Sequence, residues 1–262
     1  MQVKAKKHLG QNFLTSENIV KKIVTASEVT KTDTVIEIGP GLGILTKELA
    51  KTAKKLITIE LDTSIIPHLK ENLKKSLTQK DLKKIKILNT DALKFIPDAK
   101  TFKKGKYKIV ANIPYYITSP LITHFLTLPN SPDSLTLLVQ KEVAEKICAQ
   151  TKQFPKVTHS ILSLSVQLFA KPSYSFTVLA GSFSPVPKVD SAVIHLETKT
   201  LSKEDLATNT KILSIAKKAF SGKRKKLSNT LKTQKEIITK LNLQDDRPET
   251  LDLKDWKSIA NF

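Results

Sequence analysis

Short apolar runs alternate with longer stretches of helical periodicity over the first half of the chain, and this alternation restricts the fold more than any other feature. Strands joined through helices pair in parallel, because each helix returns the chain to the end of the sheet where the previous strand began. The alternation therefore predicts an α/β fold with a doubly wound parallel sheet. The expected strands lie near residues 34–38, 56–60, 85–89, 107–111 and 135–140, and the expected helices near 17–26, where Ser16 is a capping residue, 43–53, 63–76 and 118–127.

The pattern changes after residue 140. Further helices are expected near residues 141–150 and 158–169, followed by extended segments near 174–179 and 191–197. A Pro-rich loop, rather than a clear crossover helix, separates these two segments, so we expect them to form an antiparallel pair. From about Leu201 the pattern is wholly helical and more basic. We therefore predict a large α/β domain over residues 1–200 and a small helical domain over residues 201–262.

The segment Val35–Gly43 has the pattern of a buried strand, a glycine turn and the start of a helix. Its glycines let the backbone pass close to a ligand at a helix N-terminus. A dinucleotide-binding fingerprint would place its third glycine at position 44, which is Ile, so the spacing disfavours an oxidoreductase. The sequence Gly-Lys-Ser/Thr of a phosphate-binding loop is also missing. Glu37, just before the turn, suits a ligand with positive charge, such as a sulfonium amino acid.

Carboxylates follow the next two expected strands. Glu60 ends the second strand, roughly twenty residues beyond the glycines, where a carboxylate can accept both ribose hydroxyls. Asp91 follows the third strand and can accept an adenine amine. Each of these residues alone could be an ordinary turn residue. Because the carboxyl ends of parallel strands meet at one edge of the sheet, their succession predicts a nucleoside-binding site there.

The fourth strand is followed by Asn112-Ile113-Pro114-Tyr115. The Asn112 side-chain oxygen can accept one N–H of a base amine, and a backbone carbonyl beside Pro114 can accept the other. Two such bonds withdraw the amine from conjugation, so its nitrogen lone pair becomes available. Tyr115 offers a face on which the base can stack. The simpler alternative is a strand that ends in a Pro turn.

These motifs resemble those of the ribosomal RNA adenine-N6,N6-dimethyltransferases. The resemblance runs nearly end to end. Its C-terminal part and Arg247-Pro248-Glu249 look more like the housekeeping small-subunit enzymes than like the antibiotic-resistance relatives that modify one large-subunit adenine. The matching segments are Leu9–Leu14, Glu37–Gly41, Asn112–Tyr115, Gln140–Val143, Phe183–Val193 and Lys223–Asn229.

The resemblance implies a Rossmann-like class I S-adenosylmethionine-dependent methyltransferase fold with a small C-terminal all-helical domain. It implies S-adenosylmethionine as cofactor, S-adenosylhomocysteine as product and no metal. The implied substrate is a pair of adjacent adenosines in a hairpin loop near the 3′ end of 16S rRNA. Asn112, Pro114 and Tyr115 would be catalytic, and Tyr115 and Phe183 would stack on the base, unless Phe183 is a core aromatic. The implied cofactor-binding residues are Gln11, Asn12, Leu14, Glu37, Gly39, Gly41, Glu60, Asp91, Ala92 and Asn112.

The charge of the chain points to a polyanionic partner. Forty-four Lys and Arg against twenty-four Asp and Glu give a net charge of +20 and a pI of about 9.8. A lysine-rich solvated surface would give the same balance, but the charges are clustered. We expect small-subunit rRNA or a pre-30S particle as partner, and a non-catalytic rRNA-binding assembly factor is the alternative of another class. The predicted RNA-binding residues are Lys223, Arg224, Lys225 and Lys226.

Composition restricts the location and the chemistry. No apolar run approaches the ~18 residues of a membrane-spanning helix, and the basic N-terminus has no hydrophobic stretch behind it. The single cysteine, Cys148, excludes an internal disulfide, fits a reducing cytosol and is expected to be a buried inert thiol. The five histidines show no metal-ligand spacing. We therefore expect a cytoplasmic monomer without a metal or a membrane partner.

Overall fold

The computed structural model describes residue 6 and residues 10–98, 100–222 and 225–260. The chain forms two compact units. The first comprises the residues up to Ala144 together with Ser173–Thr198, and the second comprises Glu145–Pro172 and the residues from Lys199 onwards.

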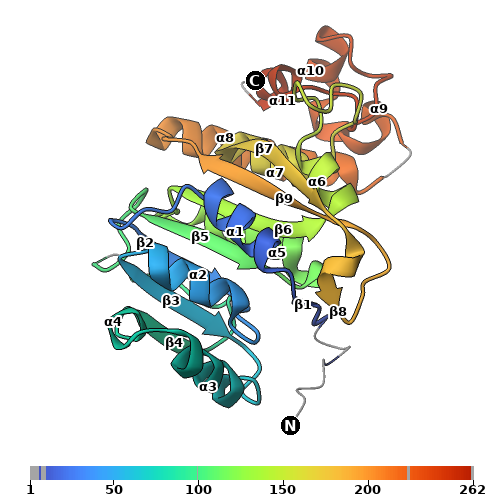
Figure 1. The fold of residues 1–262 in the computed structure, drawn as a ribbon. Coiled ribbons are helices and arrows are strands. Elements are labelled where there is room, and N and C mark those ends of the chain that lie inside the picture. The colour runs from blue at the N-terminus through green and yellow to red at the C-terminus, as the bar shows by residue number, and fades with distance from the viewer. Residues whose placement is uncertain (1–5, 7–9, 99, 223–224, 261–262) are drawn as a thin grey trace. The chain divides into compact units, whose positions relative to one another are not determined.

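The first unit is built on a sheet that is mostly parallel (Figure 1). Its strands follow the order β4-β3-β2-β5-β6-β9-β7, and every neighbouring pair from β4 to β6 is parallel, whereas β9 runs antiparallel to β6. The predicted doubly wound sheet is therefore confirmed, and the two last extended segments lie side by side in it. The strands are β2 (Thr34–Ile38), β3 (Lys55–Glu60), β4 (Ile85–Asn89), β5 (Tyr107–Asn112), β6 (Ser134–Gln140), β7 (Ala170–Val178) and β9 (Ser191–Thr198).

The helices of this unit follow from amphipathic periodicity and local caps. Ser16 accepts a hydrogen bond from the N–H of Ile19 and caps the first helix, as predicted. Val20 and Ile23 of that helix join Leu49 in the core against the sheet, and all three are fully buried. The helical elements are α1 (Glu17–Ala26), α2 (Ile44–Thr52), α3 (Ile66–Ser76), α4 (Gln79–Leu82), η2 (Tyr115–Ile117), α5 (Thr118–Thr127), η3 (Ala180–Ser182) and α6 (Lys141–Ile147), which crosses into the second unit.

A second, two-stranded sheet was not predicted. Strand β1 (Phe13–Leu14) pairs antiparallel with β8 (Phe183–Ser184), and the N–H of Thr15 donates to the carbonyl of Ser182 at 2.9 Å. This pairing joins the N-terminal segment to the loop between β7 and β9. Leu14 of β1 is 5% exposed and belongs to the core of the first unit.

The second unit is helical. It contains Glu145–Pro172 as well as the residues from Lys199 onwards, whereas the predicted helical domain covers residues 201–262 alone. The reason is packing: α7 lies against α8, and the Asn209 amide donates to the carbonyl of Leu168 at 2.9 Å. The elements are α7 (Ile161–Phe169), α8 (Lys203–Phe220), α9 (Leu227–Thr230), η4 (Lys232–Gln234), α10 (Lys235–Lys240) and α11 (Leu253–Ala260).

Cys148 is fully buried in this unit, and burial raises the pKa of its thiol to about 12, as expected of an inert thiol. No helix among the described residues is long and apolar enough to cross a membrane. The described residues also contain no cluster of three or more His, Cys, Asp and Glu side chains that could hold a metal ion.

Candidate active site

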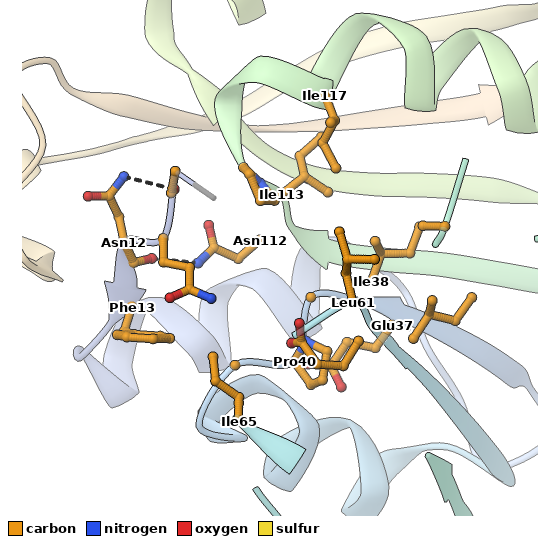
Figure 2. A pocket seen from close by; sticks show the side chains of 18 of the residues that line it. Asn12, Phe13, Glu37, Ile38, Pro40, Leu61, Ile65, Asn112, Ile113 and Ile117 are labelled. Carbon is orange, nitrogen blue, oxygen red and sulfur yellow. Dashed lines mark hydrogen bonds between the residues drawn. The ribbon is translucent and has the colours of Figure 1, made fainter. Parts of the chain in front are cut away.

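A cavity of about 840 Å³ opens at the carboxyl ends of β2, β3 and β5 in the first unit (Figure 2). The strand order reverses between β2 and β5, and open α/β sheets bind ligands at such a switch point. Its volume lies within the range of small-molecule sites, roughly 300–1,000 Å³. All ten residues predicted to bind the cofactor line this cavity, together with Pro114 and Tyr115.

The turn after β2 requires glycine, because a residue with a Cβ would be strained or crowded there. Gly41 has a φ of +53° and Gly43 a φ of +92°, values that residues with a Cβ rarely adopt. A Cβ at Gly41 would lie 3.1 Å from the Phe13 ring, and one at Gly43 would lie 2.8 Å from the Leu69 side chain. The turn therefore lets the backbone approach the cavity closely, and α2 begins directly after it at Ile44.

Glu37 is a buried acid at the end of β2. Its side chain is 1% exposed, and neither carboxylate oxygen has a hydrogen-bond partner among the described residues. Burial raises the pKa of Glu37 to about 8; the nearby Thr46 hydroxyl opposes this rise, although it forms no hydrogen bond with the carboxylate, and the negative charge of Glu60 adds a little to it. An unpartnered carboxylate that lines a cavity is stabilised by a ligand that brings a positive charge or hydrogen-bond donors.

Glu60, the last residue of β3, and Asp91, just after β4, are both held by backbone hydrogen bonds. The N–H of Asp62 donates to Glu60 Oε1 at 2.8 Å, and burial raises the pKa of the Glu60 carboxyl. The N–H of Leu93 donates to Asp91 Oδ1 at 2.9 Å. Backbone hydrogen bonds thus orient both carboxylates at the rim of the sheet, where they line the same cavity.

Asn112 closes β5 on the opposite side of the switch point from Glu60. Its Nδ2 donates to the backbone carbonyl of Asn12 at 3.2 Å, so Oδ1 is the atom available to accept a base amine (Figure 2). The hydroxyl of Tyr115 shares a hydrogen bond of 2.8 Å with Ser191, and burial raises its pKa. The ring is half-buried and lines the cavity beside Pro114.

Phe183 departs from its predicted place. Its side chain is 3% exposed and packs in the hydrophobic core with Leu14, while its neighbour Ser184 lines the cavity. The reason is the β1–β8 pairing, which fixes the side of the short strand that faces the core. The structure thus favours the core-aromatic alternative. Sequence reasoning also missed Phe13, Tyr116 and Asp62; Phe13 and Tyr116 line the cavity, and Tyr116 is 58% exposed.

The predicted RNA-binding cluster belongs to the second unit and is only partly described. Lys223 and Arg224 lie outside the described residues. Lys225 is exposed, and the Lys226 ammonium lies 2.7 Å from the carboxylate of Asp245. Because both partners of this pair are largely exposed, the pair contributes little to stability and leaves the lysine accessible.

The mostly parallel sheet, the glycine turn with buried acids and the Asn112–Tyr115 segment together define a class I S-adenosylmethionine-dependent methyltransferase. Comparison with known proteins gives the family. The family model "Ribosomal RNA adenine dimethylase" matches residues 2–261. The chain belongs to this family, whose members are S-adenosylmethionine-dependent rRNA adenine dimethyltransferases.

Individual relatives agree with the family. The chain is 35% identical to "Ribosomal RNA small subunit methyltransferase A" of Dehalococcoides mccartyi over 98% of this chain and 88% of that protein. A dimethyladenosine transferase from Plasmodium falciparum has a similar structure, with a TM-score of 0.76, 27% identity and coverage of 94% and 95% of the two chains. The 23S rRNA methyltransferase ErmE shares the fold, with a TM-score of 0.72, 24% identity and coverage of 95% and 98%.

Proposed function

We propose that this enzyme dimethylates the N6 amino groups of two adjacent adenosines in a hairpin loop near the 3′ end of 16S rRNA, in the course of small-subunit biogenesis. The similarity over almost the whole chain to a small-subunit rRNA methyltransferase supports this choice of substrate. The observation that carries the chemistry is the Asn112 amide: Asn112 lines the cavity and its Nδ2 donates to the Asn12 carbonyl, which leaves Oδ1 as the acceptor for the target amine.

The residues of the cavity fit S-adenosylmethionine. Glu37 offers an unpartnered carboxylate to a positively charged ligand, and the turn at Gly39 and Gly41 offers close backbone approach. We assign Glu60 to the ribose hydroxyls and Asp91 to the adenine amine. We assign the remaining contacts with the cofactor to other residues that line the cavity: Gln11, Asn12, Leu14, Ala92 and Asn112.

The bound cofactor supplies an electrophilic methyl group for an in-line displacement. The contribution of the chain is geometric, and alignment of reacting groups is worth up to roughly 7–11 kcal/mol in favourable cases. Asn112 Oδ1 and a carbonyl beside Pro114 accept the two N–H groups of the target amine, which turns its lone pair out of the ring system. Tyr115 stacks on the base and offsets part of the few kcal/mol required to unstack it.

The rRNA target can be tested directly. Purified enzyme and radiolabelled S-adenosylmethionine would be incubated with small-subunit and large-subunit particles from cells that lack the corresponding methyltransferases. We expect two methyl groups on each of two adjacent adenosines of 16S rRNA, located by primer extension, and strongly reduced transfer by the Asn112→Ala variant. Transfer to 23S rRNA would favour the large-subunit alternative, and binding without transfer would favour an assembly factor.

Binding of rRNA by the basic segment Lys223–Lys226 is a further part of this proposal. So are a monomeric state, a cytoplasmic location, and catalysis without a metal or a membrane. The net charge of +20 supports the RNA contact, because clustered cations release condensed counterions from phosphates.

A further inference from the structure

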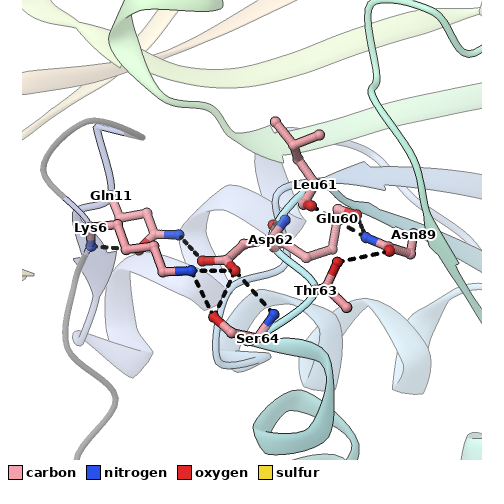
Figure 3. A network of polar contacts seen from close by, with 8 residues as sticks. All are labelled: Lys6, Gln11, Glu60, Leu61, Asp62, Thr63, Ser64 and Asn89. Atoms are coloured by element: carbon pink, nitrogen blue, oxygen red, sulfur yellow. Dashed lines mark hydrogen bonds and ion pairs between the residues drawn. The ribbon is translucent and has the colours of Figure 1, made fainter.

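Asp62 is not among the predicted site residues. It is connected to Asn112 through Gln11 and Asn12, because Gln11 donates to Asp62 and the Asn12 carbonyl accepts from Asn112. It follows Glu60 by two residues in the loop after β3 and is 6% exposed (Figure 3). Its two oxygens have different partners. Oδ1 accepts from Lys6 Nζ at 2.8 Å and from the N–H and hydroxyl of Ser64 at 3.0 and 2.7 Å. Oδ2 accepts from Gln11 Nε2 at 3.1 Å.

The side-chain amide of Gln11 is engaged at both ends. Its Nε2 donates to Asp62, and its Oε1 accepts the backbone N–H of Lys6 at 2.8 Å. The Lys6 ammonium returns to Asp62, which closes a ring of three residues. A flipped Gln11 amide would set its NH₂ group against the Lys6 N–H, so the ring permits one orientation only.

Asn12, the residue after Gln11, connects the ring to Asn112 by a hydrogen bond. The Asn12 carbonyl, which accepts from Asn112 Nδ2, lies in the peptide plane between Asn12 and Phe13. The β1–β8 pairing holds the chain from Phe13 onwards, and the Gln11 ring holds it on the other side of Asn12. Because the bond from Asn112 to Asn12 occupies Nδ2, it decides that Oδ1 and not the NH₂ group faces the target amine. A reversed Asn112 amide would present donors to donors and could not align the nucleophile.

We propose that Asp62 and Gln11 are positioning residues for methyl transfer: the hydrogen bond between them sets the Asn12 carbonyl, which in turn sets the orientation of the Asn112 amide. The inference rests on the proposed role of Asn112. Neither residue needs to touch the amine, so both act through Asn112. Although burial opposes it, hydrogen bonds from Lys6, Ser64 and Gln11 hold the pKa of Asp62 below its usual range, so the acceptor stays ionised near neutral pH.

The proposal can be tested by exchanging the donor and the acceptor of the hydrogen bond between Gln11 and Asp62. Asp62→Asn keeps an oxygen for Lys6 and Ser64 but places an NH₂ group against Gln11 Nε2. Gln11→Glu alone places a second carboxylate beside Asp62 Oδ2. The double variant Asp62→Asn/Gln11→Glu restores the ring, because the carboxylate introduced at position 11 accepts from the new amide as well as from the Lys6 N–H. Asp81→Asn is the matched control, since Asp81 also accepts from a lysine at 2.8 Å but lies at α4, outside the cavity lining.

The first readout is the single-turnover rate of methyl transfer at saturating cofactor and RNA. Each single variant should lose rate by roughly 10- to 100-fold, as misplaced reacting groups do. At saturating cofactor the double variant should recover most of the rate that either single variant loses, and the KM for RNA should not change in any of them. Asp81→Asn should keep the wild-type rate.

The second readout needs neither cofactor nor RNA. In cofactor-free protein labelled with ¹⁵N-asparagine, the Asn112 side-chain NH₂ resonance, assigned by its loss in Asn112→Ala, reports the bond to Asn12. It should move in each single variant and return in the double variant. If the resonance and the rate both stay at wild-type values in Asp62→Asn, or if the double variant shows no recovery, the positioning role is wrong. If the wild type methylates no rRNA, the proposed function fails, while the resonance still decides the role of the ring.

Discussion

The floor and the N-terminal wall of the cavity both depend on buried carboxylates but satisfy them in opposite ways. On the floor, at the ends of β2 and β3, Glu37 has no hydrogen-bond partner among the described residues and Glu60 accepts from the backbone N–H of Asp62; burial raises the pKa of both acids. The N-terminal wall consists of residues 10–14. The carboxylate beside it is that of Asp62, which accepts hydrogen bonds from Lys6, Gln11 and Ser64.

This difference in hydrogen bonding distinguishes carboxylates that can bind a ligand from carboxylates that hold the backbone in place. A buried carboxylate without partners destabilises the ligand-free protein and becomes favourable only when a ligand donates to it or brings a positive charge. A carboxylate that accepts from several neighbours has little left to offer a ligand and instead holds the backbone in place. By this criterion we assign ligand binding on the floor chiefly to Glu37, and the holding of the wall backbone to Asp62.

Asn112→Ala should have the largest effect, because Asn112 is the residue that the wall positions for the target. We expect the single-turnover rate to fall by about 100-fold or more, equivalent to about 2.7 kcal/mol in the barrier. Cofactor affinity, measured by calorimetry, should remain close to that of the wild type. A variant that keeps a near-normal rate would show that another group aligns the amine.

Glu60→Ala should weaken cofactor binding without changing the hydrogen bonds of the N-terminal wall. Loss of a charged acceptor should weaken S-adenosylmethionine binding by about 1–3 kcal/mol, or roughly 5- to 150-fold in Kd. Asp91→Ala should do the same through the adenine end, with Asp81→Ala as a control outside the cavity. Unchanged calorimetric affinity in both Glu60→Ala and Asp91→Ala would contradict the assignment of the floor to the cofactor.

Glu37→Gln should change how stability depends on pH. The pKa of Glu37 is raised from 4.5 to about 8 in the folded protein, so between these values the folded state holds a proton that the unfolded chain releases. The stability from this proton is complete below about pH 4.5 and is lost as the pH rises towards 8, by at most about 1.4 kcal/mol per pH unit.

Urea unfolding of the ligand-free protein between about pH 5 and about pH 8 measures this loss. The wild type should lose stability relative to Glu37→Gln as the pH rises, because Gln does not titrate. Parallel curves for the two proteins would mean that Glu37 is not held protonated, and the contrast between floor and wall would disappear.

The smallest effect on cofactor binding, but a clear effect on RNA binding, is expected when four cations are neutralised together: Lys223, Arg224, Lys225 and Lys226. The slope of log K against log [salt] for rRNA binding should flatten by about 0.7–0.9 for each lost phosphate contact. Cofactor affinity should not move, since Lys225 and Lys226, the described members of the cluster, belong to the other unit and do not line the cavity. A slope that stays unchanged would assign the RNA footprint to other lysines.

Local sequence determined most of the fold, because helices and strands follow from the period of apolar residues and from short-range caps. The strands at 34–38 and 85–89 and the helices at 17–26 and 118–127 have the predicted bounds. The glycine turn was also predictable, since it requires conformations that side chains oppose. Parallel strands then brought Glu37, Glu60, Asp91 and Asn112 to one edge, as their places at successive strand ends predicted.

Only the tertiary structure decided how distant segments meet. The hydrogen bond between Asn112 and Asn12 spans 100 residues of sequence, and the one between Gln11 and Asp62 spans 51. No periodicity encodes such pairs, because each depends on where two loops arrive after the sheet has formed. The burial of Phe183 and the grouping of Glu145–Pro172 with the C-terminal helices have the same origin. Local patterns specify which groups a chain offers, and long-range packing determines which of them are left for a ligand.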